Sequence, residues 1–135
     1  MKAEFNIVPM GAVRQTRADA WRNRPCVLRY RSFKDSLREQ AAPYYLPADP
    51  LIVTMKFYIP MPASWSKKKK AAMNGAYHRQ KPDIDNLSKS VMDSLWEDDS
   101  MISKINATKL WSEKGKVIME VSGANASDDR AVVTP

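Results

Sequence analysis

The chain has 135 residues, a formal net charge of +7 and one cysteine, Cys26. This length suits a single domain whose hydrophobic core is large enough to be stable without disulfides or bound metal. One cysteine excludes both an intramolecular disulfide and a cysteine-rich zinc site. No apolar run approaches the roughly 18 residues that cross a membrane, and the N-terminus has no secretory pattern. We therefore expect a cytoplasmic protein with no membrane partner and with a polyanionic partner, nucleic acid first.

The first half of the chain predicts a strand, a loop, a helix and a second strand. Residues 5–8 form a short apolar run that a proline ends. Residues 10–30 are basic and lack a clear hydrophobic period, so we expect a mobile arm or long loop there. Ser32 is a candidate cap for a helix over residues 33–42. Residues 51–59 are rich in β-branched and aromatic side chains and predict the strongest strand of the chain.

The second half predicts two helices followed by two strands. A basic helix is expected to start at Ser64 and to close near Asn74 and Gly75. A second helix is expected over residues 84–96, after a proline. Residues 101–111 and 116–121 read as strands joined by a short turn, and we expect them to form a hairpin.

This mixture of elements predicts an α/β (mixed α+β) fold with a mixed sheet flanked by helices. Residues 1–122 would form the domain, and the small, polar residues 123–135 would form a frayed tail.

Charge is distributed unevenly along the chain. Residues 11–38 carry eight basic and two acidic side chains, and residues 61–81 carry six basic and no acidic ones. Residues 83–99 reverse the sign, with six acidic side chains and one lysine, Lys89. Carboxylates repel phosphate, so a purely electrostatic binder of nucleic acid has no use for this acidic segment. Enzymes that cut nucleic acid do use carboxylates, because these hold the divalent ion that promotes the attack.

Helical geometry separates a core stripe from an adjacent stripe in residues 84–96. The core stripe, at a spacing of three and four residues, holds Ile84, Leu87, Val91 and Leu95. The adjacent stripe, turned away from the core, holds Asp85, Lys89, Met92 and Trp96. Asp83 precedes the helix, and Asp98 and Asp99 follow it and could enter the next strand. The structural alternative is that these residues cap the helix, form an Asp85–Lys89 surface pair and make a solvated turn.

The acidic segment carries an extended motif. Residues 81–95 read K-P-D-I-D-N-L-S-K-S-V-M-D-S-L, and residues 98–102 read D-D-S-M-I. This run resembles the signature of the RusA family of Holliday junction resolvases, K-P-D-x-D-N-L-x-K-x-x-x-D-x-L, a spacer, and D-D-x-x-I. The spacer, Trp96 and Glu97, is shorter here than in some members.

The resemblance implies a homodimeric, mixed α/β enzyme, mostly of phages and prophages, that cuts four-way DNA junctions in recombination or repair. It implies Mg²⁺ as the cofactor, with Mn²⁺ as a substitute, and no small-molecule cofactor. It also implies that Asp83, Asp85 and Asp99 are the metal-binding carboxylates and that Lys89 is an essential lysine.

Other basic residues are candidates for contact with the DNA backbone. We predict that role for four arginines of the arm, Arg14, Arg17, Arg22 and Arg24, and for a second set, Lys67, Lys68, Lys69, Lys70, Arg79 and Lys81. The alternative for the lysine run is an ordinary solvated helix face. His78 needs no role, and Trp96 and Trp111 are expected to be core aromatics.

The sequence therefore predicts a Mg²⁺-dependent endodeoxyribonuclease that resolves four-way junctions by paired symmetric nicks. A two-fold dimer suits this task because the junction is itself approximately two-fold symmetric. Two alternatives stay open: a DNA-binding module that cuts nothing, and a nuclease that acts on other branched DNA.

Overall fold

The computed structural model describes residues 1–44 and 50–123. These two ranges hold nine elements, where η is a 3₁₀ turn: β1 (Lys2–Phe5), η1 (Arg17–Ala20), α1 (Pro25–Ala41), β2 (Leu51–Pro60), α2 (Lys67–Met73), α3 (Ile84–Leu95), η2 (Asp99–Met101), β3 (Ile102–Ser112) and β4 (Lys116–Gly123). The predicted mixture of helices and strands in one small domain is confirmed.

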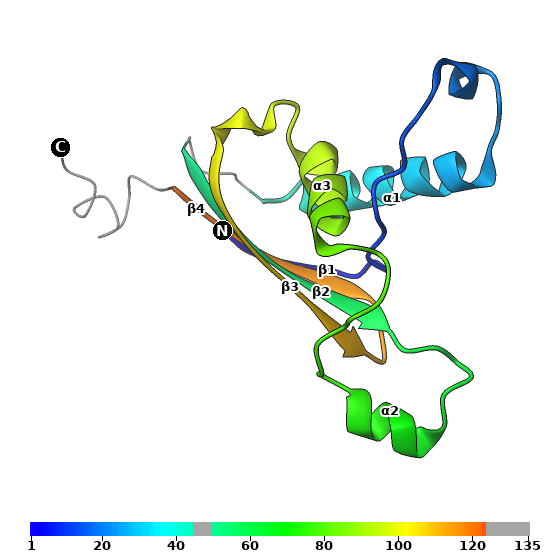
Figure 1. Cartoon of the computed structure of the whole chain (residues 1–135). Helices are drawn as coiled ribbons and strands as arrows, with labels where there is room; N and C mark the ends of the chain where they lie inside the picture. The colour runs from blue at the N-terminus through cyan, green and yellow to red at the C-terminus, as the bar shows by residue number, and fades with distance from the viewer. Residues whose placement is uncertain (45–49, 124–135) are drawn as a thin grey trace.

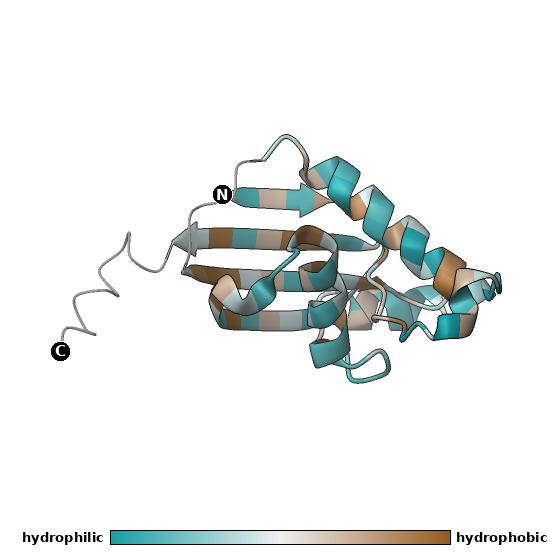
Figure 2. Ribbon diagram, turned by 90° about the horizontal axis from the view of Figure 1, so that it is seen from above, coloured by the Kyte–Doolittle hydropathy of each residue, from teal (hydrophilic) through white to brown (hydrophobic). Residues whose placement is uncertain are grey.

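The four strands form one mixed sheet in the order β1-β4-β2-β3. Strand β2 pairs in parallel with β3 along one edge and antiparallel with β4 along the other. Strand β1 closes the far edge by antiparallel pairing with β4. Figure 2 shows the four strands side by side.

The predicted hairpin of the last two strands is wrong, because β2 lies between them. Strand β2 buries every second side chain, from Leu51 to Ile59, and is the most apolar strand of the chain. A central position pairs both of its edges and covers that apolar face. The three residues between Ser112 and Lys116 therefore cross from one edge of β2 to the other.

Helices α1 and α3 cover one face of the sheet, and α2 stands beyond the ends of β2 and β3 (Figure 1). Helix α1 buries Val27, Tyr30, Phe33 and Leu37, and α3 buries Leu87 and Val91. Apart from Val27, these side chains meet the inward-facing side chains of β2 and β4 in one core. The two helices also pack against each other, which brings their polar edges together.

Helix α1 begins at Pro25, eight residues before the predicted start. Proline suits the first helical position because that residue needs no N–H partner and its φ is already helical. Val27 and Tyr30 then extend the buried stripe of Phe33 and Leu37 toward the N-terminus. The basic arm is correspondingly shorter than predicted.

Strand β1 lies at Lys2–Phe5 rather than at residues 5–8. Pairing with β4 sets this register, and it directs Ala3 and Phe5 into the core. The register of a single short strand cannot be predicted from its own sequence, because pairing with the neighbouring strand sets it.

The remaining elements lie within one to three residues of their predicted bounds. Helix α2 starts after Ser66 rather than Ser64, because the Ser66 hydroxyl accepts the Lys69 N–H at 3.1 Å. The predicted tail falls, apart from Gly123, outside the described residues. Within residues 1–44 and 50–123, no helix has the length and apolar character needed to cross a membrane.

Candidate functional site

The start of α3 presents two carboxylates to solvent. Asp83 is the N-cap residue, with extended backbone, and Asp85 lies in the first turn. The buried side chains of Leu87 and Val91 fix the rotation of the helix about its axis. Asp85 and Lys89 therefore lie on the exposed side, as the helical spacing predicted.

Three of the four carboxylates of this edge have a local partner. Lys81 Nζ lies 2.9 Å from Asp83 Oδ2, and this hydrogen bond holds the pKa of Asp83 below its ordinary value. Asp85 Oδ1 accepts the Asn86 N–H at 2.9 Å. Asp98 caps η2 by accepting the Ser100 N–H at 3.0 Å, and hydrogen bonds from Ser100 lower the pKa of Asp98. Asp99 lies exposed in the first turn of η2.

Lys89 pairs with Asp93 rather than with Asp85. The Lys89 Nζ to Asp93 Oδ2 distance is 2.9 Å, so the Asp85–Lys89 pair of the structural alternative is wrong. The hydrogen bond from Lys89 to Asp93 is the main cause that raises the pKa of Lys89, and the charge of Asp99 adds a smaller contribution. Lys89 thus lies in the electrostatic field of the η2 carboxylate as well as that of its own helix.

The donor atoms at this edge suit a hard cation, since carboxylate oxygens are the ligands that Mg²⁺ prefers. The described residues, however, contain no group of three or more histidine, cysteine, aspartate or glutamate side chains placed to hold one ion. Asp83 is turned toward Lys81, and Asp98 is occupied as a cap. The chemistry of the donor set fits the ion, and the side chains as placed do not converge on one point.

The arm is fastened to the start of α3 by Asn86. The Ala12 N–H donates to Asn86 O at 3.3 Å, and Asn86 Nδ2 donates to Ala12 O at 3.2 Å. A Cβ on Gly11 would fall 2.5 Å from Asn86 Nδ2, so a larger residue at this position would displace the Asn86 side chain from its bond to Ala12. The arm beyond it is therefore held beside the acidic edge.

A second carboxylate system lies inside the arm. Asp19 is 2% exposed and accepts hydrogen bonds from Arg24 Nε at 2.8 Å, Arg24 Nη2 at 2.8 Å and the Thr16 N–H at 2.6 Å. The Arg24 guanidinium holds the pKa of Asp19 far below its ordinary value. Arg24 also donates to Arg14 O at 3.2 Å, so this arginine, predicted from the sequence to contact DNA, is instead engaged in holding the arm together.

The predicted DNA-binding residues are distributed over two surfaces. Arg14 and Arg17 are exposed in the arm. On and after α2, Lys67, Lys68, Lys69, Arg79 and Lys81 are exposed and Lys70 is half-buried. Lys69 Nζ lies 4.2 Å from the centre of the Trp65 ring, a cation–π contact.

His78 lies in the core. It is 4% exposed, and its ring centre lies 4.2 Å from that of Trp111. Burial, followed by the charge of Lys109, lowers the pKa of His78. Trp96 and Trp111 are also buried, which confirms that they are core aromatics.

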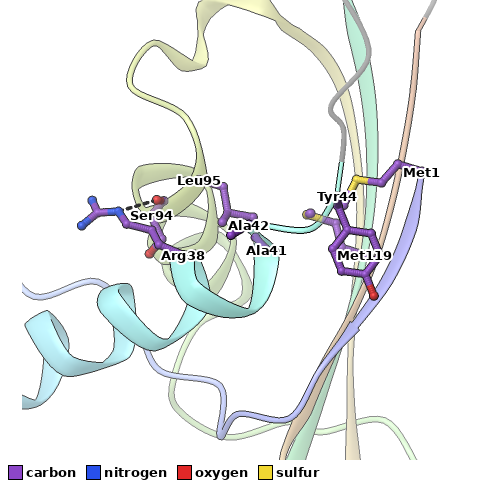
Figure 3. A pocket seen from close by; sticks show the side chains of 8 residues that line it. All are labelled: Met1, Arg38, Ala41, Ala42, Tyr44, Ser94, Leu95 and Met119. Atoms are coloured by element: carbon purple, nitrogen blue, oxygen red, sulfur yellow. Dashed lines mark hydrogen bonds between the residues drawn. The ribbon is translucent and has the colours of Figure 1, made fainter.

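Two hollows border the paired helices. One, of about 190 Å³, lies at the ends of α1 and α3, where Arg38 Nε donates to Ser94 O at 2.8 Å (Figure 3). None of the predicted site residues lines it. The other, of about 450 Å³, is bounded by the arm, α1 and α3, and Lys89 is part of its wall. Tyr30 and Lys34 line this second hollow, and the sequence motifs did not single them out.

A mixed sheet that carries an acidic helix edge within a basic chain defines a small nucleic-acid-cutting enzyme. The chain belongs to the RusA family of endodeoxyribonucleases, because the model of that family matches residues 6–122. Members of this family are hydrolases that act on branched DNA junctions. The chain is also 34% identical over 104 residues to the uncharacterised protein YqaN of Bacillus subtilis (strain 168), across 69% of this chain and 73% of that protein.

Proposed function

We propose that this protein is a divalent-metal-dependent endodeoxyribonuclease that resolves four-way DNA junctions by paired symmetric nicks as a homodimer. The observation that carries the proposal is the exposed acidic edge in a basic member of the RusA family. Asp83, Asp85 and Lys89 extend from one helix, and the charge of Asp99 reaches Lys89. Exposed carboxylates beside a lysine serve no evident purpose in a protein that only binds phosphate.

The carboxylates Asp83, Asp85 and Asp99 would hold Mg²⁺, with Mn²⁺ as a substitute. When bound, such an ion lowers the pKa of an attacking water and neutralises charge on the phosphorus centre. Lys81 contacts only Oδ2 of Asp83, so Oδ1 is open to an ion. An ion bound at Asp83 would compete with the Lys81 ammonium and favour its transfer to a DNA phosphate, the role predicted for Lys81.

Lys89 would stabilise the negative charge that develops on the phosphate. Its ammonium is held by Asp93, 2.9 Å away, on the exposed side of α3. A fixed cation that faces developing charge stabilises the transition state more than the ground state. Lysine is protonated at neutral pH, and the hydrogen bond to Asp93 raises the pKa of Lys89 further.

The basic surfaces would hold the DNA. Exposed basic residues precede the acidic edge along the chain in two segments: the arm, with Arg14 and Arg17, and the region of α2, with Lys67, Lys68, Lys69, Arg79 and Lys81. Half-buried Lys70 adds to the charge of α2. Contacts of this kind orient the duplex arms and carry no sequence information, so preference for a cut site must arise elsewhere.

A junction-cleavage assay tests the proposal. The protein is mixed with a labelled mobile four-way junction in Mg²⁺, Mn²⁺ or EDTA, beside matched flap and linear duplex DNA. We expect cutting of the junction with either ion and none in EDTA. A supercoiled plasmid that extrudes a cruciform reports on pairing, because coordinated nicks linearise it and single nicks only relax it.

Three results would contradict this function in distinct ways. Junction binding without cutting in either ion would identify a non-catalytic DNA-binding module. Equal cutting of flaps would identify a nuclease of other branched DNA. Relaxed plasmid without linear product, from a protein that sediments as a monomer, would exclude paired nicking by a dimer.

A further inference from the structure

The hollow between the arm, α1 and α3 is a cationic site next to the acidic edge. Its volume of about 450 Å³ lies in the range of small-ligand pockets and has room for a phosphodiester group. Three of its lining side chains are cationic, Arg14, Lys34 and Lys89, and one is anionic, Asp93. Since Asp93 is paired with Lys89, the charge of Arg14 and Lys34 is not balanced within the wall.

A buried hydroxyl in the same wall points to a ligand. Tyr30 is 3% exposed, and its hydroxyl has no hydrogen-bond partner among the described residues. A buried hydroxyl without a hydrogen-bond partner lowers the stability of the fold, so its presence in a native structure requires an explanation. Burial, with a contribution from the charge of Asp93, raises the pKa of Tyr30, so the hydroxyl stays protonated and can donate to an anion.

Lys34 is held in position at this wall. Its Nζ lies 4.8 Å from the centre of the Tyr30 ring, a cation–π contact, and the residue is half-buried. The Tyr30 ring is in turn stacked on Phe33 in the core, with ring centres 6.5 Å apart. Lys34 and Tyr30 thus line the hollow from consecutive turns of α1.

We propose that this hollow binds a backbone phosphate of the DNA beside the one being cut, through Lys34, the Tyr30 hydroxyl and Lys89. The proposal rests on the function proposed above and adds two residues from α1 to the machinery on α3. The Lys89 ammonium has three N–H donors, so it can reach this phosphate and the scissile one while it keeps its hydrogen bond to Asp93.

The first test measures DNA binding without divalent ions, so that cutting does not interfere. We expect Lys34→Gln to weaken binding of the four-way junction about tenfold and to lower the slope of log K against log salt by about one. The matched control is Lys56→Gln, because Lys56 is an exposed lysine on the face of β2 opposite to its buried side chains. This control is expected to bind within about twofold of the native protein.

Tyr30→Phe separates a ligand-binding role from a structural one. This change keeps the ring in the core and removes only the unpaired hydroxyl, so the unfolding midpoint should stay the same or rise. A binding role predicts several-fold weaker junction binding in the same variant. The control Tyr58→Phe, on β2, should change neither quantity.

A chemical scan of the DNA locates the contact. Single phosphates around the cut site are replaced one at a time by neutral methylphosphonates, and binding by native and Lys34→Gln protein is compared. We expect one position at which the neutral group weakens binding by the native protein and leaves binding by Lys34→Gln unchanged. At all other positions the two proteins should respond alike.

The outcomes are distinguishable from failure of the nuclease itself. If the native protein cuts junctions while both variants bind like their controls, the phosphate site is wrong and the proposed function stands. If Lys34→Gln responds to every methylphosphonate as the native protein does, the contact is also wrong. If the native protein binds no DNA, both proposals fail together.

Discussion

Two groups of carboxylates in this protein have opposite surroundings. Asp19 in the arm is buried, and three N–H groups from Arg24 and Thr16 satisfy its oxygens. Asp83, Asp85 and Asp99 at the α3–η2 edge are exposed. Of these, Asp83 has one lysine as a partner and Asp85 one backbone N–H.

The difference separates acids that stabilise the fold from acids whose oxygens are available to bind a ligand. A buried carboxylate with a full set of donors contributes to stability and has no oxygen left for a ligand. An exposed carboxylate with one weak partner contributes little to stability and can exchange that partner for an ion. The charge of a side chain alone does not separate these two roles.

The sharpest way to test the comparison is to neutralise the exposed acids one at a time. We expect Asp83→Asn, Asp85→Asn and Asp99→Asn each to reduce cleavage more than about 100-fold, because each loses charge meant for the metal. Junction binding should stay equal or become tighter, since repulsion of phosphate falls. Cleavage assays, junction titrations and thermal unfolding are compared for each variant. A variant that cuts normally removes its residue from the proposed metal ligands.

Lys89→Ala should lose most cleavage while the fold is kept. The side chain is 62% exposed, and its pair with Asp93 is a surface ion pair worth less than about 1 kcal/mol. The measurement combines single-turnover cleavage with the unfolding midpoint, and Lys56→Ala is the control. A clearly lower midpoint would show that Lys89 is a structural partner of Asp93.

The buried acid should show the reverse pattern. Asp19→Asn removes the charge that Arg24 faces and places amide hydrogens against its donors, so the unfolding midpoint should fall clearly. Cleavage per folded molecule should stay near that of the native protein. The matched control is Asp35→Asn, since Asp35 is 79% exposed and lies 3.7 Å from Arg38. Loss of cleavage at an unchanged midpoint would break the comparison.

The pH dependence of stability tests the same carboxylate without mutation. The pKa of Asp19 is lowered in the folded state, so its stabilisation is complete above the ordinary Asp value of about 4 and is lost as pH falls below it. The gap in unfolding midpoint between native protein and Asp19→Asn should therefore narrow below about pH 4. A gap that stays constant down to pH 2 would mean that the Arg24 contact does not shift this group.

The smallest effect is expected from Asp98→Asn. Asparagine also accepts an N–H at an N-cap position, so the bond from Ser100 can be kept. Cleavage and unfolding midpoint should both change by little, in contrast to the neighbouring Asp99→Asn. An equally large loss of cleavage would make Asp98 the metal ligand in place of Asp99.

Much of the architecture could be read from local sequence patterns. The apolar run of β2, the stripe of α3 and the motif of residues 81–102 predicted their elements closely and led to the family. Helical spacing also placed Asp85 and Lys89 on the exposed side of α3. These features depend on neighbours within one turn or one strand, which is the range over which sequence periodicity acts.

The hydrogen-bond and ion-pair partners of the site residues could not be predicted from local sequence patterns. Lys89 has an acid four residues away on each side, and spacing alone does not decide that it pairs with Asp93. The role of Arg24 depends on how the arm folds over Asp19. The start of α1 at Pro25 depends on a buried stripe that only the packed sheet completes.

The sequence by itself determined the composition of the site: an acidic edge on one helix, a lysine within it and basic segments around it. Only the tertiary structure decided the strand order, because the choice of β3 and β4 as the neighbours of β2 depends on pairing between segments that are far apart in the sequence. The tertiary structure also brought Arg14, Lys34 and Lys89 to one hollow from three separate segments. Such long-range neighbours follow from the burial of apolar surface across the whole chain, which no local pattern records.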